Sequence, residues 1–492
     1  MNEKHIAAID IGSFKISLAV AKVEGGNTQI LFYGSVPSAG IRDSAIFNPM
    51  QAGKAIKSLL AEAENELKIK ILQVVVGLPK YGIREENAEA VGERSNPDDC
   101  ITAEEIEALK QLAQDTHEIG NPEKEQIYGA IAQSFSTPDF INISENDIVG
   151  MISGEVTGNF KVFIGKRNAI NILYKVFNDL GVAIARMYFS PLAAAKAVLT
   201  EEELQSGVAL IDLGAQVTSV SVYQNKVLSH YASIPFGGET VTSDISSECV
   251  ISRQLAENIK CAFGGCIPDK LQTLSEKILQ IETDDISSCN QIPVNYLSEI
   301  ITAREKEIID AMLYEIGASG LSENLRRGIV ITGGGARMIN IGNYIKELSG
   351  YNVRTAYPIN RFICTGCEDI LDINAVTTAG MLLMAKDTDI DCCVPDEGLA
   401  EAESVVREEP ADIPVQAPEA EESQAVPEPE KIREPETDKT PDTPAEDKKK
   451  AKESARKEKD SEKHAKKPWG GLFKGFTMKW NEMYETMSNE DV

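Results

Sequence analysis

The chain has 492 residues, of which 42% are hydrophobic, and a formal net charge of −28. Its length predicts roughly three domains, and its strongly acidic balance argues against unspecific binding to nucleic acid. The sequence has neither a basic and apolar leader at its start nor a run of about 18 apolar residues. We therefore expect no signal peptide and no membrane-spanning helix.

The chain opens with a short apolar run from Ile6 to Ile11, which predicts a buried strand, and a second strand follows from Ile16 to Val20. Between them, Gly12 and Ser13 predict a tight turn. Asp10 lies at the end of the first strand, where a carboxylate is costly to bury unless it meets a cation or hydrogen-bond donors. A glycine at position 12 lets a ligand approach backbone N–H groups, which can hold phosphate oxygens.

The next elements predict a three-layer α/β domain. A third strand is expected at Gln29 to Val36. A helix is expected to begin at Pro49, with apolar residues on one face as far as Leu67, and a strand buried on both faces is expected at Ile71 to Gly77. A more polar region then runs from Tyr81 to about Phe160 and predicts a small inserted α+β module. The module is expected to hold a helix at about 102–118 and strands at 125–135 and 155–164.

Helices are expected from Asn168 and from Ser190, and then the opening hairpin recurs. Val208 to Ala215 aligns with Ile6 to Ser13, which places Asp212 at the position equivalent to Asp10. Two such hairpins facing each other would hold Mg²⁺ and a polyphosphate between two acids, because Mg²⁺ is commonly held by one or two carboxylates plus phosphates. The alternative is a pair of unrelated Asp-x-Gly turns.

Two glycine clusters follow. Gly237 and Gly238 precede a helix, whose N-terminus could bind phosphate, although an ordinary turn and cap would look the same. On the next helix, Glu257 and Lys260 share a face and could contact a base or ribose, or form a surface pair. Three glycines at 333–335 join a buried strand to a helix expected near 339. They permit backbone contact with a flat ligand, or simply mark a turn.

The nine cysteines stand at irregular spacings, which suits a reducing cytosol better than a disulfide framework. Cys364 and Cys367, or the adjacent Cys392 and Cys393, could form a metal or redox site, although no histidine stands nearby.

Beyond Pro395 the composition changes. Residues 396–447 hold 18 acidic and four basic residues with many prolines, whereas residues 448–467 hold ten basic and four acidic residues. Such stretches cannot bury enough apolar surface to fold, so we expect a disordered linker.

The terminal segment has helical apolar spacing. One helix face would carry Trp469, Leu472, Phe473, Phe476, Trp480, Met483, Tyr484 and Met487. Together with the basic flank, this face is typical of a helix that lies in the membrane interface. Docking into the groove of a partner is the alternative.

The motifs together resemble the actin/Hsp70/sugar-kinase ATPase superfamily and, within it, the FtsA family of bacterial cell-division actin homologues. Asp10-Ile-Gly-Ser and Asp212-Leu-Gly-Ala match the two phosphate motifs, and the glycines at 333–335 match the adenosine motif. The stretch from Ile234 to Ile245 and the later Ala256-Glu-Asn-Ile-Lys match features more specific to FtsA. The resemblance covers residues 1 to about 390.

The resemblance implies an α/β, actin-like ATPase fold: two RNase H-like domains facing a nucleotide cleft, with an inserted α+β subdomain, a disordered linker and a C-terminal amphipathic helix. The implied bounds are 1–80 with 165–200 for the first actin-like domain, 81–164 for the insert, 201–392 for the second actin-like domain, 395–467 for the linker and 468–488 for the helix.

The resemblance also implies ATP and Mg²⁺ as cofactors, with Mg²⁺ held through water by Asp10 and Asp212. The implied nucleotide-binding residues are Asp10, Gly12, Ser13, Phe14, Lys15, Asp212, Gly214, Ala215, Gln216, Gly237, Gly238, Glu257, Lys260, Gly333, Gly334, Gly335 and Arg337.

The implied function is filament formation on the cytoplasmic face of the inner membrane at the division site, tethering of the tubulin-like FtsZ and recruitment of later division proteins. The chain departs from active relatives, which often carry Glu or Gln where Ser190 stands, and Ala215 narrows the second loop. We therefore expect at most slow ATP turnover. A pilus-type membrane-recruited ATPase, a small-molecule kinase and a chaperone-type ATPase remain alternatives. The chaperone-type alternative would require a substrate-binding β-domain after the ATPase body, where this chain has only the predicted linker.

Overall fold

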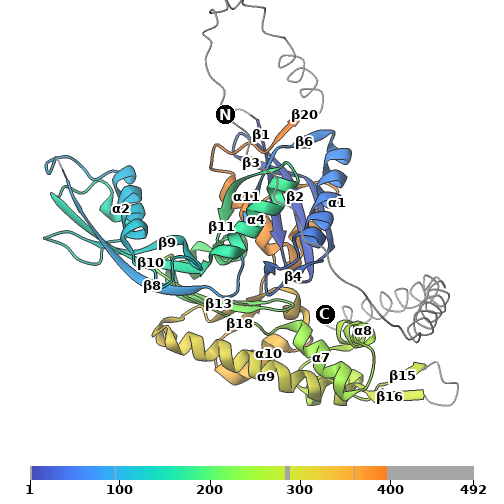
Figure 1. Cartoon of the computed structure of the whole chain (residues 1–492). Helices are drawn as coiled ribbons and strands as arrows, with labels where there is room; N and C mark the ends of the chain where they lie inside the picture. Colours follow the sequence, from blue (N-terminus) through green and yellow to red (C-terminus); the bar gives the residue numbers. More distant parts are fainter. Residues whose placement is uncertain (1–2, 95, 283–288, 360, 396–492) are drawn as a thin grey trace, which may run out of the picture. The chain divides into compact units, whose positions relative to one another are not determined.

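The computed structural model describes residues 3–94, 96–282, 289–359 and 361–395 (Figure 1), all within one compact unit, Met1–Arg407. The predicted linker from residue 396 and the predicted helix from Trp469 to Met487 lie outside the described residues. Within the described ranges, no helix combines the length and apolarity needed to cross a bilayer.

The first sheet has six strands in the order β11-β7-β1-β2-β3-β19. Strand β1 runs antiparallel to β2 and parallel to β7, and Asp10 pairs with Ser17 near the turn. The strands are β1 (Lys4–Ile11), β2 (Lys15–Glu24), β3 (Asn27–Pro37), β7 (Gln73–Gly77), β11 (Ala183–Tyr188) and β19 (Ile363–Cys364).

The second sheet repeats this pattern in the order β14-β13-β12-β17-β18. Strand β12 is antiparallel to β13 and parallel to β17, and Asp212 pairs with Ser219 as Asp10 pairs with Ser17. The predicted repeat is therefore present in topology and in register. The strands are β12 (Val208–Leu213), β13 (Thr218–Gln224), β14 (Val227–Ile234), β17 (Ile329–Thr332) and β18 (Val353–Thr355).

Helices cover both faces of the two sheets. Successive residues of β1 and β12 point to opposite faces, and most of them are apolar, so both faces must be buried. Ala7 and Ile9 pack with α1 (Pro49–Leu67) and α4 (Arg167–Asp179) in one core cluster. A second cluster joins both sheets to two further helices, α5 (Ser190–Val198) and α11 (Val376–Ala385). A third cluster packs the remaining face of the second sheet against helices of the second half: α7 (Gly238–Glu248), α8 (Arg253–Phe263), α9 (Val294–Ala318) and α10 (Ile341–Ser349).

Helices α5 and α11 touch closely because small residues line their contact. A Cβ atom on Gly380 would overlap the backbone carbonyl of Ala193, so only glycine fits there. This pair of helices connects the two sheets and fixes the edges at which Asp10 and Asp212 lie.

The inserted region forms its own three-stranded antiparallel sheet, β8-β10-β9, with a separate core. Its elements are β8 (Arg84–Glu93), α2 (Ala103–Thr116), β9 (Glu125–Ser136), α3 (Glu145–Ile148) and β10 (Glu155–Lys166). Glu85 of β8 connects the insert to the second sheet: it lies 2.6 Å from Lys161 Nζ and 2.9 Å from His230 Nδ1 of β14.

The remaining elements are short. They are β4 (Ile41–Arg42), β5 (Ala45–Ile46), β6 (Ile69–Ile71), α6 (Glu201–Ser206), β15 (Ile278–Glu282), β16 (Cys289–Pro293), β20 (Cys393–Pro395) and the 3₁₀ turns η1 (Pro268–Lys270), η2 (Gln272–Leu274), η3 (Ser322–Asn324), η4 (Gly334–Arg337), η5 (Glu368–Leu371) and η6 (Ile373–Ala375).

Two predicted elements differ in the structure. The single strand expected at Ile71 to Gly77 is wrong at its start, because it breaks at Leu72. The backbone N–H groups of Leu72 and Gln73 both donate to the carbonyl of Cys392, at 3.0 and 3.3 Å, so the chain turns there between β6 and β7. The three glycines lead first into η4, and α10 begins at Ile341.

Candidate functional site

Two tight loops at equivalent edges of the two sheets form the centre of the site. In the loop between β1 and β2, the N–H of Gly12 donates to the Lys15 carbonyl at 3.1 Å. In the loop between β12 and β13, the N–H of Gly214 donates to the Val217 carbonyl, also at 3.1 Å. A Cβ on Gly12 would lie 2.8 Å from the Lys15 oxygen, so the loop requires glycine there. The same local geometry therefore presents Asp10 and Asp212.

A lysine that the sequence motifs do not indicate contacts Asp212 and is close enough to Asp10 to affect its charge. Lys80 Nζ lies 2.6 Å from Asp212 Oδ2 and donates to Thr377 Oγ1 at 3.2 Å. The signal that could have found it is its place just beyond β7, because the carboxyl ends of parallel strands meet at one edge of a sheet and β7 runs beside β1.

The charges of these residues affect one another. Burial raises the pKa of Asp10, the Lys80 ammonium acts to lower it, and Asp212 adds to the rise. Burial disfavours the charge on Lys80, but the carboxylates of Asp212 and Asp10 outweigh burial and hold the pKa of Lys80 above its usual value. The ammonium therefore stays charged at neutral pH, and its charge partly neutralises the acid pair.

The second loop contacts the start of α7. The N–H of Gly238 donates to the Gly214 carbonyl at 3.0 Å, and the N–H of Glu239 donates to the Ala215 carbonyl at 2.7 Å. A Cβ on Gly237 would lie 2.8 Å from the Ala215 oxygen. The paired glycines thus allow the helix to begin directly against the loop.

Glu257 and Lys260 form an ion pair at 2.8 Å on α8. Lys260 Nζ also donates to the Gly238 carbonyl at 2.7 Å and to Thr242 Oγ1 at 2.8 Å, so the pair fastens α8 to the start of α7. Burial acts to raise the pKa of Glu257, but hydrogen bonds from Lys260 and Thr242 lower it below its usual value. Only 11% of the Lys260 side chain is exposed, so this is more than a routine surface pair.

The three glycines lie against the second loop. Gly333 has a φ of 85°, and a Cβ there would clash with Asp212 Oδ1. A Cβ on Gly335 would lie 2.9 Å from Leu213 Cβ. Gly334 lies in the same 3₁₀ turn as Arg337, whose guanidinium pairs with Asp372. The glycine cluster therefore lies beside Asp212 rather than elsewhere on the surface.

Of the first-loop residues, Ser13 and Lys15 are hydrogen-bonded within the protein, whereas the side chain of Phe14 is exposed. Ser13 Oγ accepts a hydrogen bond from the N–H of Ser44 at 3.0 Å, and Lys15 Nζ donates to Tyr33 Oη at 2.9 Å. Burial lowers the pKa of Lys15 against the opposing effects of Asp372 and Asp10. The Phe14 side chain is 66% exposed.

Gln216 of the second loop connects to the same β4–β5 turn as Ser13. Its Oε1 accepts a hydrogen bond from the N–H of Asp43 at 2.8 Å, and its Nε2 donates to Glu239. The structure thus brings the residues of the two loops, the α7 start, α8 and η4 into one connected region, through contacts that the sequence did not predict.

Ser190, the residue before the proline of α5, is buried, and its hydroxyl donates to the Leu78 carbonyl at 2.7 Å. Cys364 and Cys367 are half-buried thiols, and burial raises the pKa of each. Among the described residues, no cluster of three potential ligands that could hold a metal ion is present.

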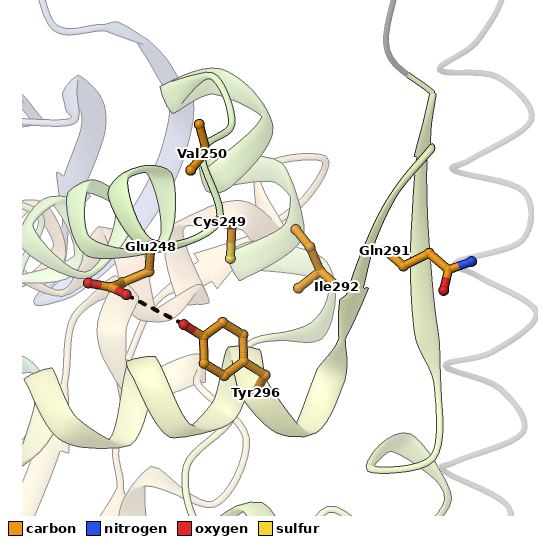
Figure 2. Close-up of a pocket in the computed structure, with 6 residues that line it drawn as sticks. All are labelled: Glu248, Cys249, Val250, Gln291, Ile292 and Tyr296. Carbon is orange, nitrogen blue, oxygen red and sulfur yellow. Dashed lines mark hydrogen bonds between the residues drawn. The ribbon is translucent and has the colours of Figure 1, made fainter. Parts of the chain in front are cut away.

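A pocket of about 290 Å³ lies away from the acid pair, between the end of α7, strand β16 and the start of α9 (Figure 2). Tyr296 Oη donates to Glu248 Oε2 at 3.4 Å, so two of its lining residues are bonded to each other. Its lining residues are Glu248, Cys249, Val250, Gln291, Ile292 and Tyr296, none of which belongs to the predicted nucleotide site.

Comparisons with known proteins agree with this architecture. The family model described as "Cell division protein FtsA" matches residues 209–377. The cell division protein FtsA of Neisseria meningitidis serogroup B is 29% identical over 358 residues, which is 72% of this chain and 84% of that protein. The FtsA of Streptococcus pneumoniae is 29% identical over 72% of this chain and 76% of its own length. A solved PilM-PilN type IV pilus biogenesis complex is similar with a TM-score of 0.54 at 14% identity, covering 78% of this chain and 99% of that one.

The chain therefore has the actin-like ATPase fold, in which two related sheets present equivalent acid-bearing loops. Within that class, the matches agree with the resemblance seen in the sequence: over most of its length the chain is similar to FtsA cell division proteins.

Proposed function

We propose that this protein is an ATP-binding, actin-like cell-division protein that polymerises on the cytoplasmic face of the inner membrane and tethers the FtsZ ring there. In this proposal it also recruits later division proteins to the division site. The observation that carries the nucleotide part is the pair of acids, Asp10 and Asp212, on loops of identical hydrogen-bond geometry. The similarity to FtsA proteins supports the cell-division part.

The residues at the site suit Mg²⁺ and ATP. Asp10 and Asp212 offer the carboxylate oxygens that would hold Mg²⁺ through water, and the bound ion would neutralise phosphate charge. Gly12 and Gly214 let the two loops turn tightly, because a Cβ on either would meet a carbonyl of its own loop. The other backbone N–H groups of these loops would then face phosphate oxygens. The glycines at 333–335 would lie under the adenosine, with Glu257 and Lys260 near its base or ribose.

The proposal also assigns the domain bounds that the family resemblance implies, and it assigns a membrane-binding role to the terminal segment, residues 468–488. A single amphipathic helix binds a bilayer modestly, because ordering it opposes the gain from burial. Polymerisation would present many such helices at once and raise avidity. The alternative that a structural similarity favours is a pilus-type ATPase, since the PilM-PilN complex shares the fold. The similarity to FtsA sequences favours the cell-division role.

The proposal is tested by sedimenting the purified full-length chain with liposomes of anionic lipid, with and without ATP. We expect ATP to increase both assembly, seen by electron microscopy, and the fraction bound to liposomes. A tubulin-like FtsZ should co-sediment only when the chain is present. A chain that binds ATP but neither assembles nor recruits FtsZ would contradict the proposal and leave the pilus-type or kinase alternatives.

A further inference from the structure

Lys80 is held in place by its backbone. Beyond β7, the N–H of Leu78 donates to the Tyr188 carbonyl at 2.8 Å, and its carbonyl accepts from Ser190 Oγ at 2.7 Å. The carbonyl of Lys80 itself accepts a hydrogen bond from Tyr231 Oη of β14. Elements of both halves therefore fix the position from which this side chain extends.

The ammonium of Lys80 lies where phosphates would have to approach the acids. It contacts Asp212 Oδ2 at 2.6 Å, and only 20% of its side chain is exposed. An ammonium has three N–H donors, and within the described residues two of them have partners, Asp212 and Thr377. One donor is left for a ligand, and the long flexible stem of lysine lets the group exchange partners.

Charge balance gives this lysine a role. Two carboxylates alone would repel a polyphosphate, which is itself strongly negative, and a divalent ion balances only part of that total charge. Lysine is a common phosphate-binding residue that acts as a point charge. Resting on the proposed function, we infer that Lys80 is a phosphate-binding residue that exchanges Asp212 for phosphate oxygens of a bound nucleoside triphosphate. The exchange releases the Asp212 carboxylate for the metal ion and its waters.

A direct contact between lysine and phosphate does not depend on the metal, which separates it from the role of the acids. We expect the wild-type full-length chain to bind ATP measurably in EDTA, and more tightly with Mg²⁺. Lys80→Met and Lys80→Gln should each weaken ATP binding at least tenfold in EDTA, by isothermal titration calorimetry. The glutamine variant removes the positive charge but keeps a hydrogen-bond donor for Asp212. It therefore tests the charge even if the methionine variant fails to fold.

The chain offers a matched control. Lys161 and Glu85 are also 2.6 Å apart, and their side chains are 19% and 17% exposed, against 20% and 15% for Lys80 and Asp212. Lys161→Met breaks an equally buried ion pair, and Glu85 keeps its contacts with His230 and with the N–H of Tyr231. Because Lys161 contacts neither loop, ATP affinity should stay within about twofold of wild type, a difference of about 0.4 kcal/mol.

Three outcomes overturn the inference. The first is that Lys80→Gln protein binds ATP in EDTA as tightly as wild type does. The second is that this variant binds ATP more tightly than wild type in the presence of Mg²⁺. Either result would show that Lys80 is only a counter-ion of the acids. Wild-type protein that binds ATP only with Mg²⁺ would exclude a metal-independent contact. The proposed nucleotide function fails separately, if wild type binds no ATP under either condition.

Discussion

The backbone N–H of Asp43 donates a hydrogen bond of 2.8 Å to Oε1 of Gln216, and this bond joins the β4–β5 turn of the first half to the loop between β12 and β13. The neighbouring N–H of Ser44 donates to Ser13 in the first loop at 3.0 Å. Asp43 and Ser44 both have positive φ, 48° and 63°, which non-glycine residues rarely adopt. The turn thus holds an uncommon backbone conformation in which consecutive N–H groups reach both loops.

Replacing Gln216 should loosen this connection. Gln216→Ala removes the acceptor for Asp43 and the donor to Glu239, and two hydrogen bonds typically contribute about 1–2 kcal/mol. We expect the free energy of unfolding in urea to fall by that amount. Asp43→Asn is the control, because it keeps the N–H donor and tolerates a left-handed backbone. An unchanged midpoint for Gln216→Ala would mean that the bond contributes nothing in solution.

Asp212→Asn should weaken Mg²⁺-dependent ATP binding at least tenfold, a loss of at least about 1.4 kcal/mol. The amide cannot hold the waters of the ion as a carboxylate does. Calorimetric titration in Mg²⁺ and in EDTA measures the effect, which should largely disappear in EDTA because Lys80 then remains for the phosphates. Equal affinity of variant and wild type in Mg²⁺ would refute the assignment of Asp212.

ATP turnover should be slow. The family resemblance implies that Ser190 stands where active relatives often carry Glu or Gln, and its buried hydroxyl already donates to the Leu78 carbonyl. It can therefore neither accept a proton from the attacking water as a carboxylate would nor orient that water as an amide would. We expect a steady-state rate below about 1 s⁻¹, the low end of ordinary enzymes, in a phosphate-release assay. A faster rate that Asp212→Asn abolishes would contradict this expectation.

Glu305 of α9 gives a prediction about pH. Its side chain is buried, and among the described residues Oε2 has no hydrogen-bond partner. Burial raises the pKa of Glu305 to about 7, with a smaller opposing effect from Lys260. The folded protein keeps this proton up to pH 7, whereas the unfolded chain loses it above about pH 4.5. The folded state therefore loses stability as pH rises between these values.

The loss amounts to about 3 kcal/mol over that window, at about 1.4 kcal/mol per pKa unit. Glu305→Gln cannot ionise, so its stability relative to wild type should rise by this amount from pH 4.5 to 7 and then level off. Urea denaturation at several pH values measures it. A difference that does not change with pH would show that Glu305 is ionised at its usual pKa in the folded protein.

Trp480→Glu tests the terminal segment. A charge in the middle of the predicted apolar face should release the protein from anionic liposomes, since burying each large apolar side chain contributes about 1.5–3 kcal/mol at most. High salt should also weaken binding, because residues 448–467 are basic. ATP affinity should stay unchanged, because the predicted linker separates the segment from the proposed nucleotide site. If the variant sediments with liposomes as wild type does, docking into a partner's groove replaces the membrane role.

The elements with strong periodicity were predictable. Helix α1 begins at Pro49 as predicted and ends at Leu67, the last apolar residue named on its predicted face, and the hairpin strands lie where apolar runs and alternation indicated them. Strand β8 was not predicted, because its sequence is mostly polar and lacks alternation, and it forms by pairing along the length of β10. The break at Leu72 was also unpredictable, since its partner, Cys392, stands 320 residues away in the sequence.

The sequence by itself determined the repeated hairpin, with Asp10 and Asp212 at equivalent positions and glycines where the loops need them, because strand alternation and turn chemistry are local properties. Only the tertiary structure decided which cation meets those acids. Lys80 stands 132 residues before Asp212, and the 2.6 Å contact between them exists because α5 and α11 pack against both sheets and bring their edges together. The Asp43–Gln216 bond spans 173 residues and depends on the same packing.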